Sequence, residues 1–179
     1  MISTIKNILA LTTIFFATTI IFAQDAASPN YNQGFRLGFG VNVAAPLDKP
    51  YDFALGADAR IQYDLSKKYS ITFTTGFNNL FVKGDNNDLG YIPAKVGFKA
   101  FVIQDQFYLM GEAGAAFAVT NNYDKTSLLI SPSIGYATKY IDISIRYELL
   151  SDFPALDSSN NPRNGINQIG LRLAYGFKL

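Results

Sequence analysis

The chain has 179 residues, of which 49% are hydrophobic, 15% aromatic and 16% charged, against about 25% charged in an average globular domain. Its length fits a single domain. Lysine and arginine total 15 and aspartate and glutamate total 14, so no net charge favours nucleic-acid binding. Histidine and cysteine are absent, which excludes disulfides, thiolate nucleophiles, imidazole bases and the usual zinc, copper and haem ligand sets.

The first predicted element is a secretory signal peptide over residues 1–23. Lys6 precedes an apolar run over 8–22, and Ala23 supplies the small residue before a cleavage point. The run is shorter than the roughly 20 residues that a transmembrane helix requires, so cleavage is favoured over a retained anchor. Since no later stretch is as apolar, the mature chain could cross a membrane only with strands.

From Gly34 onward the dominant hydrophobic period is two, which predicts β-strands. In the first segment Phe35 and Leu37 share one face while Arg36 and Gly38 share the other. The same alternation recurs seven more times along the chain. The eight predicted strands cover residues 34–43, 53–65, 69–77, 94–102, 107–119, 128–138, 141–149 and 169–179.

The two faces of these segments differ in charge and in bulk. The apolar face carries no charge and most of the aromatic side chains, whereas the polar face is rich in small residues and has Phe101 and Tyr108 as its aromatics. A soluble, ligand-holding barrel with an apolar interior is the alternative to a membrane barrel with an apolar exterior. An eight-stranded barrel encloses only enough space for its own side chains, and a soluble one needs a charged exterior. We therefore place the apolar face against lipid.

An open sheet edge in hydrocarbon would leave backbone groups without partners, so the sheet must close into a ring. The predicted fold is thus all-β: an eight-stranded antiparallel up-and-down transmembrane β-barrel over residues 34–179. The connections at 66–68, 103–106 and 139–140 are tight turns, whereas 44–52, 78–93, 120–127 and 150–168 are long. Short turns on one rim and long loops on the other are typical of bacterial outer-membrane barrels, with the short side in the periplasm. Residues 24–33 are then a short N-terminal periplasmic segment.

The final strand carries the most specific local pattern. Gln168, Gly170, Leu173 and Tyr175 fit the polar-x-Gly-x-x-apolar-x-apolar signal of outer-membrane barrels, although the chain does not end on an aromatic residue. With this strand and layout, the mature chain resembles the small eight-stranded barrels of the OmpX, OmpW and opacity-protein type. It is most similar to the outer-membrane β-barrel domain proteins of Bacteroidota. The resemblance implies a monomer in outer-membrane lipid, inserted by the barrel-assembly machinery, which reads that signal.

The inward-facing charged side chains form the candidate site. They are Arg36, Asp58, Arg60, Lys95, Lys99, Glu112, Arg146, Glu148 and Arg172, with Asp64, Asp142 and Lys178 on the same face. If the 103–106 turn sets the register, Gly97 faces Glu112, and Lys95 and Lys99 lie diagonally beside that carboxylate. The set could form an ion-selective or ligand-gripping constriction, or a salt-bridged plug that keeps the barrel rigid. The plug is favoured because buried charges must be paired and a narrow barrel leaves little room.

No motif predicts catalysis. The chain has no G-x-S-x-G elbow, and Ser131 and Ser133 have no identifiable base. Barrel enzymes that resemble this architecture rely on a histidine, which is absent here. Residues 84–90 and 157–164 are rich in Asp and Asn but lack EF-hand spacing, so they are expected to be solvated loops. We expect no enzyme activity, no cofactor and no metal.

The long connections supply the variable, exposed surface. Leu80, Phe81, Tyr123, Phe153 and Leu156 are apolar residues within them, and could either grip a hydrophobic ligand or partner, or cap the barrel mouth. The expected function is a non-enzymatic structural or surface-interaction role through extracellular loops, with a narrow pore or hydrophobic-solute conduit as the alternative.

The face assignment also predicts which substitutions the barrel accepts. An arginine at Ile145 or Leu171 on the apolar face is expected to impair folding severely. A lysine at Thr74 on the polar face is expected to be tolerated better, and loss of the Glu112 carboxylate is expected to destabilise the barrel.

Overall fold

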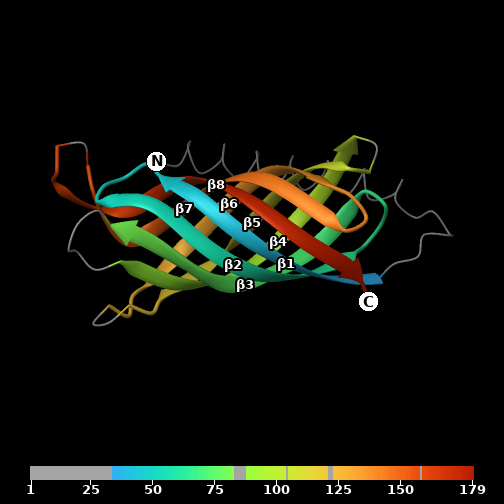
Figure 1. Cartoon of the computed structure of the whole chain (residues 1–179), viewed down its shortest axis with the longest axis horizontal. Coiled ribbons are helices and arrows are strands. Elements are labelled where there is room, and N and C mark those ends of the chain that lie inside the picture. The colour runs from blue at the N-terminus through green and yellow to red at the C-terminus, as the bar shows by residue number, and fades with distance from the viewer. Residues whose placement is uncertain (1–33, 83–87, 104, 121–122, 158) are drawn as a thin grey trace, which may run out of the picture. The chain divides into compact units, whose positions relative to one another are not determined.

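The computed structural model describes residues 34–82, 88–103, 105–120, 123–157 and 159–179. These residues form one closed antiparallel barrel in which each strand pairs with its neighbours in sequence (Figure 1). The strands are β1 Gly34–Pro46, β2 Tyr51–Asp64, β3 Tyr69–Val82, β4 Leu89–Ile103, β5 Phe107–Ala118, β6 Thr126–Ala137, β7 Ile141–Leu156 and β8 Pro162–Lys178. The predicted eight-stranded all-β fold is confirmed.

The predicted signal peptide at 1–23 and the segment 24–33 lie outside the described residues. Within the ranges that the structure describes, no helix is long and apolar enough to cross a membrane.

The barrel closes through a seam between β1 and β8. Arg36 pairs with Lys178 at one end of this seam, and Pro46 pairs with Gln168 at the other. Since the strands alternate in direction, the start of β1 and the end of β8 meet at the same rim, where Figure 1 marks the C-terminus. The β2–β3, β4–β5 and β6–β7 connections reach this rim, which we call the short-turn rim.

The strands extend further toward the opposite, long-loop rim than the sequence predicted. Residues 78–82, 89–93, 150–156 and 162–168 were expected in connections and instead continue β3, β4, β7 and β8. The β7–β8 hairpin projects at the left of Figure 1. The physical reason is that inward side chains near this rim, such as Leu80, Leu150 and Ile166, are apolar, while outward ones such as Asp152 and Arg163 are charged and exposed. The alternation of polar inward and apolar outward residues that marks the rest of each strand is therefore lost.

The outward face is apolar over most of the height of the barrel. Large hydrophobic side chains are exposed on every strand; Val41, for example, is 61% exposed and Val96 is 58% exposed. Soluble monomers rarely expose a contiguous apolar surface on this scale. The exterior therefore matches hydrocarbon rather than water, as the exteriors of membrane barrels do.

Aromatic pairs gather on the outer surface near the short-turn rim. Their ring centroids are 4.8 Å apart for Phe35 and Tyr63, 5.6 Å for Tyr69 and Phe98, 4.9 Å for Phe107 and Tyr136, and 5.8 Å for Tyr140 and Tyr175. Amphipathic rings at this level suit the boundary between hydrocarbon and headgroups.

The interior has two layers. A polar layer runs from the short-turn rim past the middle of the barrel, and an apolar core fills the end at the long-loop rim. This core contains Ala54, Leu80, Leu89, Tyr91, Ala116, Ala118, Leu129, Leu150, Phe153, Ala155 and Ile166. The register of β7 against β8 shifts between Leu150 and Pro154, and beyond this irregularity Phe153 and Ala155 are the buried residues of the strand. A bulge re-aims side chains in this way.

Candidate functional site

The candidate site is the polar layer of the lumen, which is built from inward positions of all eight strands. Five cations (Arg60, Lys95, Lys99, Arg146 and Arg172) and five carboxylates (Asp58, Asp64, Glu112, Asp142 and Glu148) lie inside it. Arg36 and Lys178 lie at the short-turn rim of the same face, where they form a cross-strand pair. The interior charges thus balance, which is what burial in a low-dielectric space requires.

Glu112 lies at the centre of the first ion-pair cluster. The Thr74 hydroxyl donates to its Oε1 at 2.7 Å, and Arg60 Nη2 lies 3.3 and 3.4 Å from its two oxygens. Arg60 Nε also donates to the Thr74 hydroxyl at 2.9 Å, and Lys95 Nζ lies 3.4 Å from Glu112 Oε2. Gly97 faces Glu112 across the β4–β5 pair, as the predicted register has it.

Lys95 connects this cluster to a second one around Glu148. Its Nζ lies 3.2 Å from Glu148 Oε2, while the Tyr91 hydroxyl donates to Glu148 Oε1 at 2.8 Å. Gln168 Nε2 donates to the same oxygen at 3.0 Å. One lysine therefore bridges two carboxylates from different strands.

Lys99 does not join Glu112 as the sequence suggested. Its Nζ donates to Asp142 Oδ2 at 2.7 Å and lies 3.9 Å from the centre of the Tyr108 ring. The Tyr108 hydroxyl donates to the other Asp142 oxygen at 2.7 Å. The difference arises because Asp142 comes from β7, across the lumen, and a sequence offers no signal for contacts across a barrel interior.

Arg172 and Asp58 form an ion pair with several hydrogen bonds between the guanidinium and the carboxylate. Arg172 Nε donates to both carboxylate oxygens at 3.0 and 2.9 Å, and its Nη2 reaches Oδ1 at 2.5 Å. Asn42 Nδ2 adds a bond to Asp58 Oδ2 at 2.9 Å. Because Arg172 and Asn42 bind the oxygens of Asp58, while Glu112 is held by its own cations, Asp58 is an ion-pair partner and not half of an acid pair with Glu112.

The short-turn end of the polar layer is held by Asp64. Arg36 Nε donates to it at 2.8 Å, Gln62 Nε2 at 2.6 Å and the Ser70 hydroxyl at 2.8 Å. Asp64 was therefore part of the predicted face but had no predicted role. The alternation of its strand predicted its inward direction, whereas its hydrogen-bond partners were not predicted.

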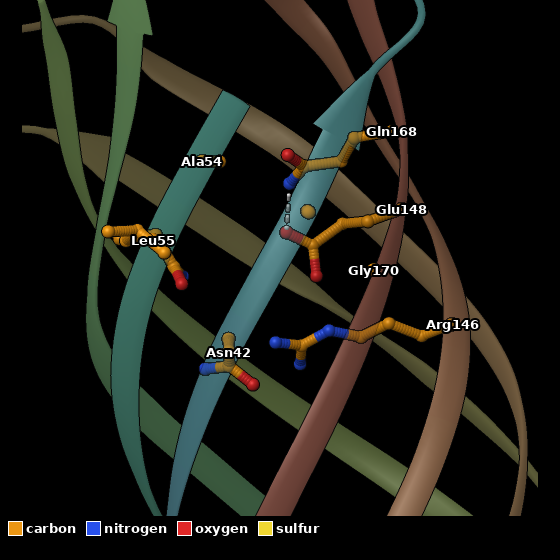
Figure 2. Close-up of a pocket in the computed structure, with 9 residues that line it drawn as sticks. Asn42, Ala54, Leu55, Arg146, Glu148, Gln168 and Gly170 are labelled. Atoms are coloured by element: carbon orange, nitrogen blue, oxygen red, sulfur yellow. Dashed lines mark hydrogen bonds between the residues drawn. The ribbon is translucent and has the colours of Figure 1, made fainter. Parts of the chain in front are cut away.

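Arg146 faces a small cavity at the edge of the polar layer nearest the long-loop rim. Figure 2 shows its guanidinium between Asn42 and Glu148, with the dashed bond from Gln168 to Glu148 beside it. The cavity has room for about one water molecule. Asn42 Oδ1 and Gln168 Oε1 have no protein hydrogen-bond partner there, so a water that donates to them and accepts from Arg146 fits the site. A space of this size does not hold a substrate.

The apolar core closes the lumen beyond this cavity. Leu80, Leu129, Leu150 and Phe153 are 0% exposed, and Tyr123 packs against them from the β5–β6 connection. Leu80 and Phe153, which were expected in exposed loops, are thus buried in strands. Their burial supports the hypothesis that these apolar residues cap the barrel mouth.

A set of polar contacts fastens the β1–β2 loop to the β7–β8 hairpin over this core. The Lys49 carbonyl accepts from the Leu156 amide at 2.6 Å, and the Tyr51 hydroxyl donates to the Pro154 carbonyl at 2.9 Å. Asp48 accepts from the amide and the side chain of Asn167 at 2.7 and 2.8 Å. We call these contacts the mouth latch.

The 157–164 loop uses its carboxylate for its own turn. Asp157 accepts hydrogen bonds from the Ser159 and Asn161 amides at 2.8 Å each, and the bonds from Asn161 and Ser159 hold the pKa of Asp157 below its usual value. This is an Asx-type turn rather than an array of free ligands. Among the described residues, no group of three or more acidic side chains could hold a metal ion.

The residues of the predicted assembly signal lie on both faces of β8. Gln168 is inward and donates to Tyr91 at 3.0 Å and to Glu148, and Gly170 is inward beside Ala44. Leu173 and Tyr175 face outward and are 48% and 56% exposed. Whether this arrangement acts as a signal is a property of the unfolded chain, so it remains a prediction.

Tyr108 owes its position in the lumen to a glycine on the next strand. A Cβ atom on Gly135 would overlap the Tyr108 ring. We therefore expect Gly135→Ala to destabilise the barrel by about 1–3 kcal/mol, because the ring must leave both Asp142 and Lys99. Urea unfolding in detergent measures the effect.

Gly111→Ala is the matched control for this substitution. Gly111 faces outward, and a Cβ there would meet nothing within 4 Å. Equal midpoints for the two alanine variants would contradict the packing of Tyr108 over Gly135.

Comparison with known proteins supports the fold. No family model matches this chain, and no curated protein matches it. The N-terminal β-barrel domain of Pseudomonas aeruginosa OprF aligns with a TM-score of 0.58 at 12% identity, covering 82% of this chain and 100% of that domain. Ail of Yersinia pestis aligns with a TM-score of 0.55 at 15% identity over 80% of this chain and 99% of Ail.

Neisserial surface protein A gives a TM-score of 0.50 at 16% identity, covering 83% of this chain and 99% of that protein. Such identities show the fold alone. The chain thus has the fold of small eight-stranded outer-membrane barrels, and its resemblance to that broad class is confirmed at this level.

Proposed function

We propose that this protein is a non-enzymatic barrel of a bacterial outer membrane with a structural or surface-interaction role. In this proposal residues 1–23 direct export and are cleaved, residues 24–33 stay in the periplasm, and residues 34–179 insert as a monomer through the barrel-assembly machinery. The short-turn rim faces the periplasm and the long-loop rim faces out. The outward apolar face and the fold shared with OprF, Ail and Neisserial surface protein A support this placement.

The observation that carries the proposal is the filled lumen. Ten balanced charges occupy the polar layer, eleven buried hydrophobic residues fill the end at the long-loop rim, and the cavity between them has room for about one water. A conduit for ions or hydrophobic solutes would need a continuous path through these layers. The surface of the long-loop rim is then the part of the molecule left to act on other molecules.

The mouth latch makes that surface firm. By joining the β1–β2 loop to the β7–β8 hairpin through backbone and side-chain bonds, it holds a projecting hairpin in one position. A preordered surface loses less conformational entropy on binding than a flexible loop does. This favours a surface-interaction role over a purely passive one.

The charge of this rim bears on the kind of partner. Ail has been solved with the heparin analogue sucrose octasulfate, but here Asp52, Asp88, Asp124, Asp152 and Asp157 outnumber the nearby Lys49, Lys125 and Arg163. A polyanion would be repelled by such a rim. We therefore infer a neutral or basic partner surface. We also propose that the protein is related to the small barrels of the OmpX, OmpW and opacity-protein type, and most closely to the outer-membrane β-barrel domain proteins of Bacteroidota.

Planar-bilayer recording of the purified, folded protein tests the filled lumen. We expect no steady single-channel conductance, since water has no continuous path across the polar layer and the apolar core. Refolding is checked first by the heat-dependent shift in gel mobility, and location by membrane fractionation. Reproducible unitary openings would overturn the proposal in favour of a pore, and recovery of the mature protein as soluble periplasmic material would overturn the location.

A further inference from the structure

The short-turn rim carries a concentration of lysines that the proposed function does not use. Lys67 and Lys68 lie in the β2–β3 turn, Lys139 lies in the β6–β7 turn, and Lys178 ends β8. All four are exposed. The acidic residue among the described turns of this rim is Asp105. We call these four lysines the basic rim.

The basic rim is continuous around one side of the barrel. The Gly176 amide donates to the Tyr140 carbonyl at 2.7 Å, which joins the β6–β7 turn to the end of β8. The next strand around the barrel is β1, where Gly34 pairs with Asp64 at the edge of the β2–β3 turn. The lysines therefore follow one another along neighbouring elements rather than being scattered.

The turn lysines differ from those inside the lumen in their partners. Lys95 and Lys99 are each within 3.5 Å of a carboxylate. In the part of the chain that the structure describes, Lys67, Lys68 and Lys139 form no ion pair. Their charges are therefore available to an anion outside the protein.

The aromatic pairs fix the depth at which this anion must lie. Tyr140 stacks on Tyr175, and the Lys139 ammonium lies 5.0 Å from the centre of the Tyr140 ring. Tyr63 and Tyr69 flank the β2–β3 turn in the same way. Aromatic side chains mark the boundary of the hydrocarbon, and flexible lysines just beyond them reach the level of lipid phosphates.

We propose that the basic rim binds the phosphates of anionic phospholipids, of the phosphatidylglycerol type, in the leaflet that meets the short-turn rim. This rests on the proposed membrane location. The favoured partner is a lipid and not a soluble polyanion because the turn lysines Lys67, Lys68 and Lys139 are contiguous with the apolar, lipid-facing surface, which would hold the acyl chains of the same molecule. Each lysine near an anionic surface adds to the attraction.

Native mass spectrometry of the folded protein tests this directly. The protein is released from micelles that contain equimolar phosphatidylglycerol and phosphatidylethanolamine with identical acyl chains. We expect phosphatidylglycerol adducts to exceed phosphatidylethanolamine adducts by about threefold or more. The triple variant Lys67→Gln, Lys68→Gln, Lys139→Gln should lose this preference while keeping its heat-dependent gel shift.

A matched pair of single variants locates the effect. Lys139→Gln removes one charge from the basic rim, and Lys125→Gln removes one exposed charge from the long-loop rim. The first should lower the preference and the second should leave it unchanged. Equal adducts of the two lipids, or equal effects of the two single variants, would overturn the lipid proposal while leaving the location standing. Failure to fractionate with membranes would overturn the proposed location, and with it the lipid proposal that rests on it.

A second experiment tests whether the basic rim binds peptidoglycan, an anionic polymer of the periplasm, instead of phospholipid. The same triple variant is compared with the parent in sedimentation with sacculi. If the variant loses sedimentation while its lipid preference is unchanged, the basic rim recognises peptidoglycan and the lipid proposal is wrong. If it loses lipid preference and sediments like the parent, the lipid proposal stands.

Discussion

Replacing Leu171 by arginine is expected to lower the stability of the folded barrel by about 2–4 kcal/mol. Leu171 lies in the middle of β8, is 46% exposed on the outer surface, and is flanked across the sheet by Val43 and Ile145. An arginine there would place a charge in hydrocarbon, and neither cross-strand neighbour offers a carboxylate. Ile145→Arg should behave alike because the two positions are cross-strand partners.

The measurement is the urea midpoint and folded yield in liposomes, scored by the heat-dependent gel shift. Val102→Arg is the control, since Val102 is also outward but lies beside the short-turn rim, where the cost falls to about 0–1 kcal/mol. If Leu171→Arg and Ile145→Arg fold as well as the parent, the apolar face does not meet lipid.

Replacing Glu112 by alanine is expected to cost more, about 3–5 kcal/mol. The substitution leaves Arg60 without its carboxylate partner, deprives Lys95 of one of two, and removes the acceptor of the Thr74 hydroxyl. The loss of stability comes from leaving a buried positive charge without a partner, and not from the net contribution of the ion pair to folding. Urea unfolding of the refolded protein measures it.

Glu112→Gln separates charge from shape in this experiment. It keeps an acceptor for Thr74 and nearly the same volume but removes the negative charge, so it should remain well below the parent in stability. Asp124→Ala removes an exposed carboxylate at the long-loop rim and should change stability by about 0.5 kcal/mol or less. A midpoint for Glu112→Ala that matches Asp124→Ala would show that the lumen is wet enough to solvate its charges.

The structure argues against one comparison that the sequence suggested. Thr74 lies on the polar face, as predicted, but it is 0% exposed and hydrogen-bonded to both Arg60 and Glu112. A lysine there would add a cation beside Arg60 and Lys95 in a space that is already filled. Tolerance of Thr74→Lys is therefore no longer expected, because the period of a strand reveals its face and not the room on that face.

The strand count and the faces followed from the sequence because alternation is local. Ile141, Ile143 and Ile145 alternate with Asp142, Ser144 and Arg146, so nothing outside β7 is needed to assign them. The same rule failed where the lumen is apolar: Leu80 and Phe153 follow no alternation of polarity and were placed in loops. Their burial depends on side chains from other strands, which a single segment does not reveal.

The partners of the lumen charges were harder to predict for a geometric reason. Gly97 opposite Glu112 follows from one tight turn, because the β4–β5 hairpin fixes that register. The pairs of Lys99 with Asp142 and of Arg172 with Asp58 join strands that are not neighbours in the sheet. They depend on the diameter of the closed barrel and on which side chains cross it.

The β1–β8 seam has a consequence for the order in which the molecule can assemble. Every other strand pair is a hairpin of neighbours in sequence, whereas Arg36 and Lys178 join the two ends of the barrel, which is the largest loop the chain can close. Until β8 is present, both β1 and β7 keep an unpaired edge. β8 is therefore the strand that completes two interfaces at once, and the mouth-latch contact from Asp48 to Asn167 spans the same seam. Closure of the ring thus waits for β8, and a chain truncated before β8 is expected to remain an open sheet.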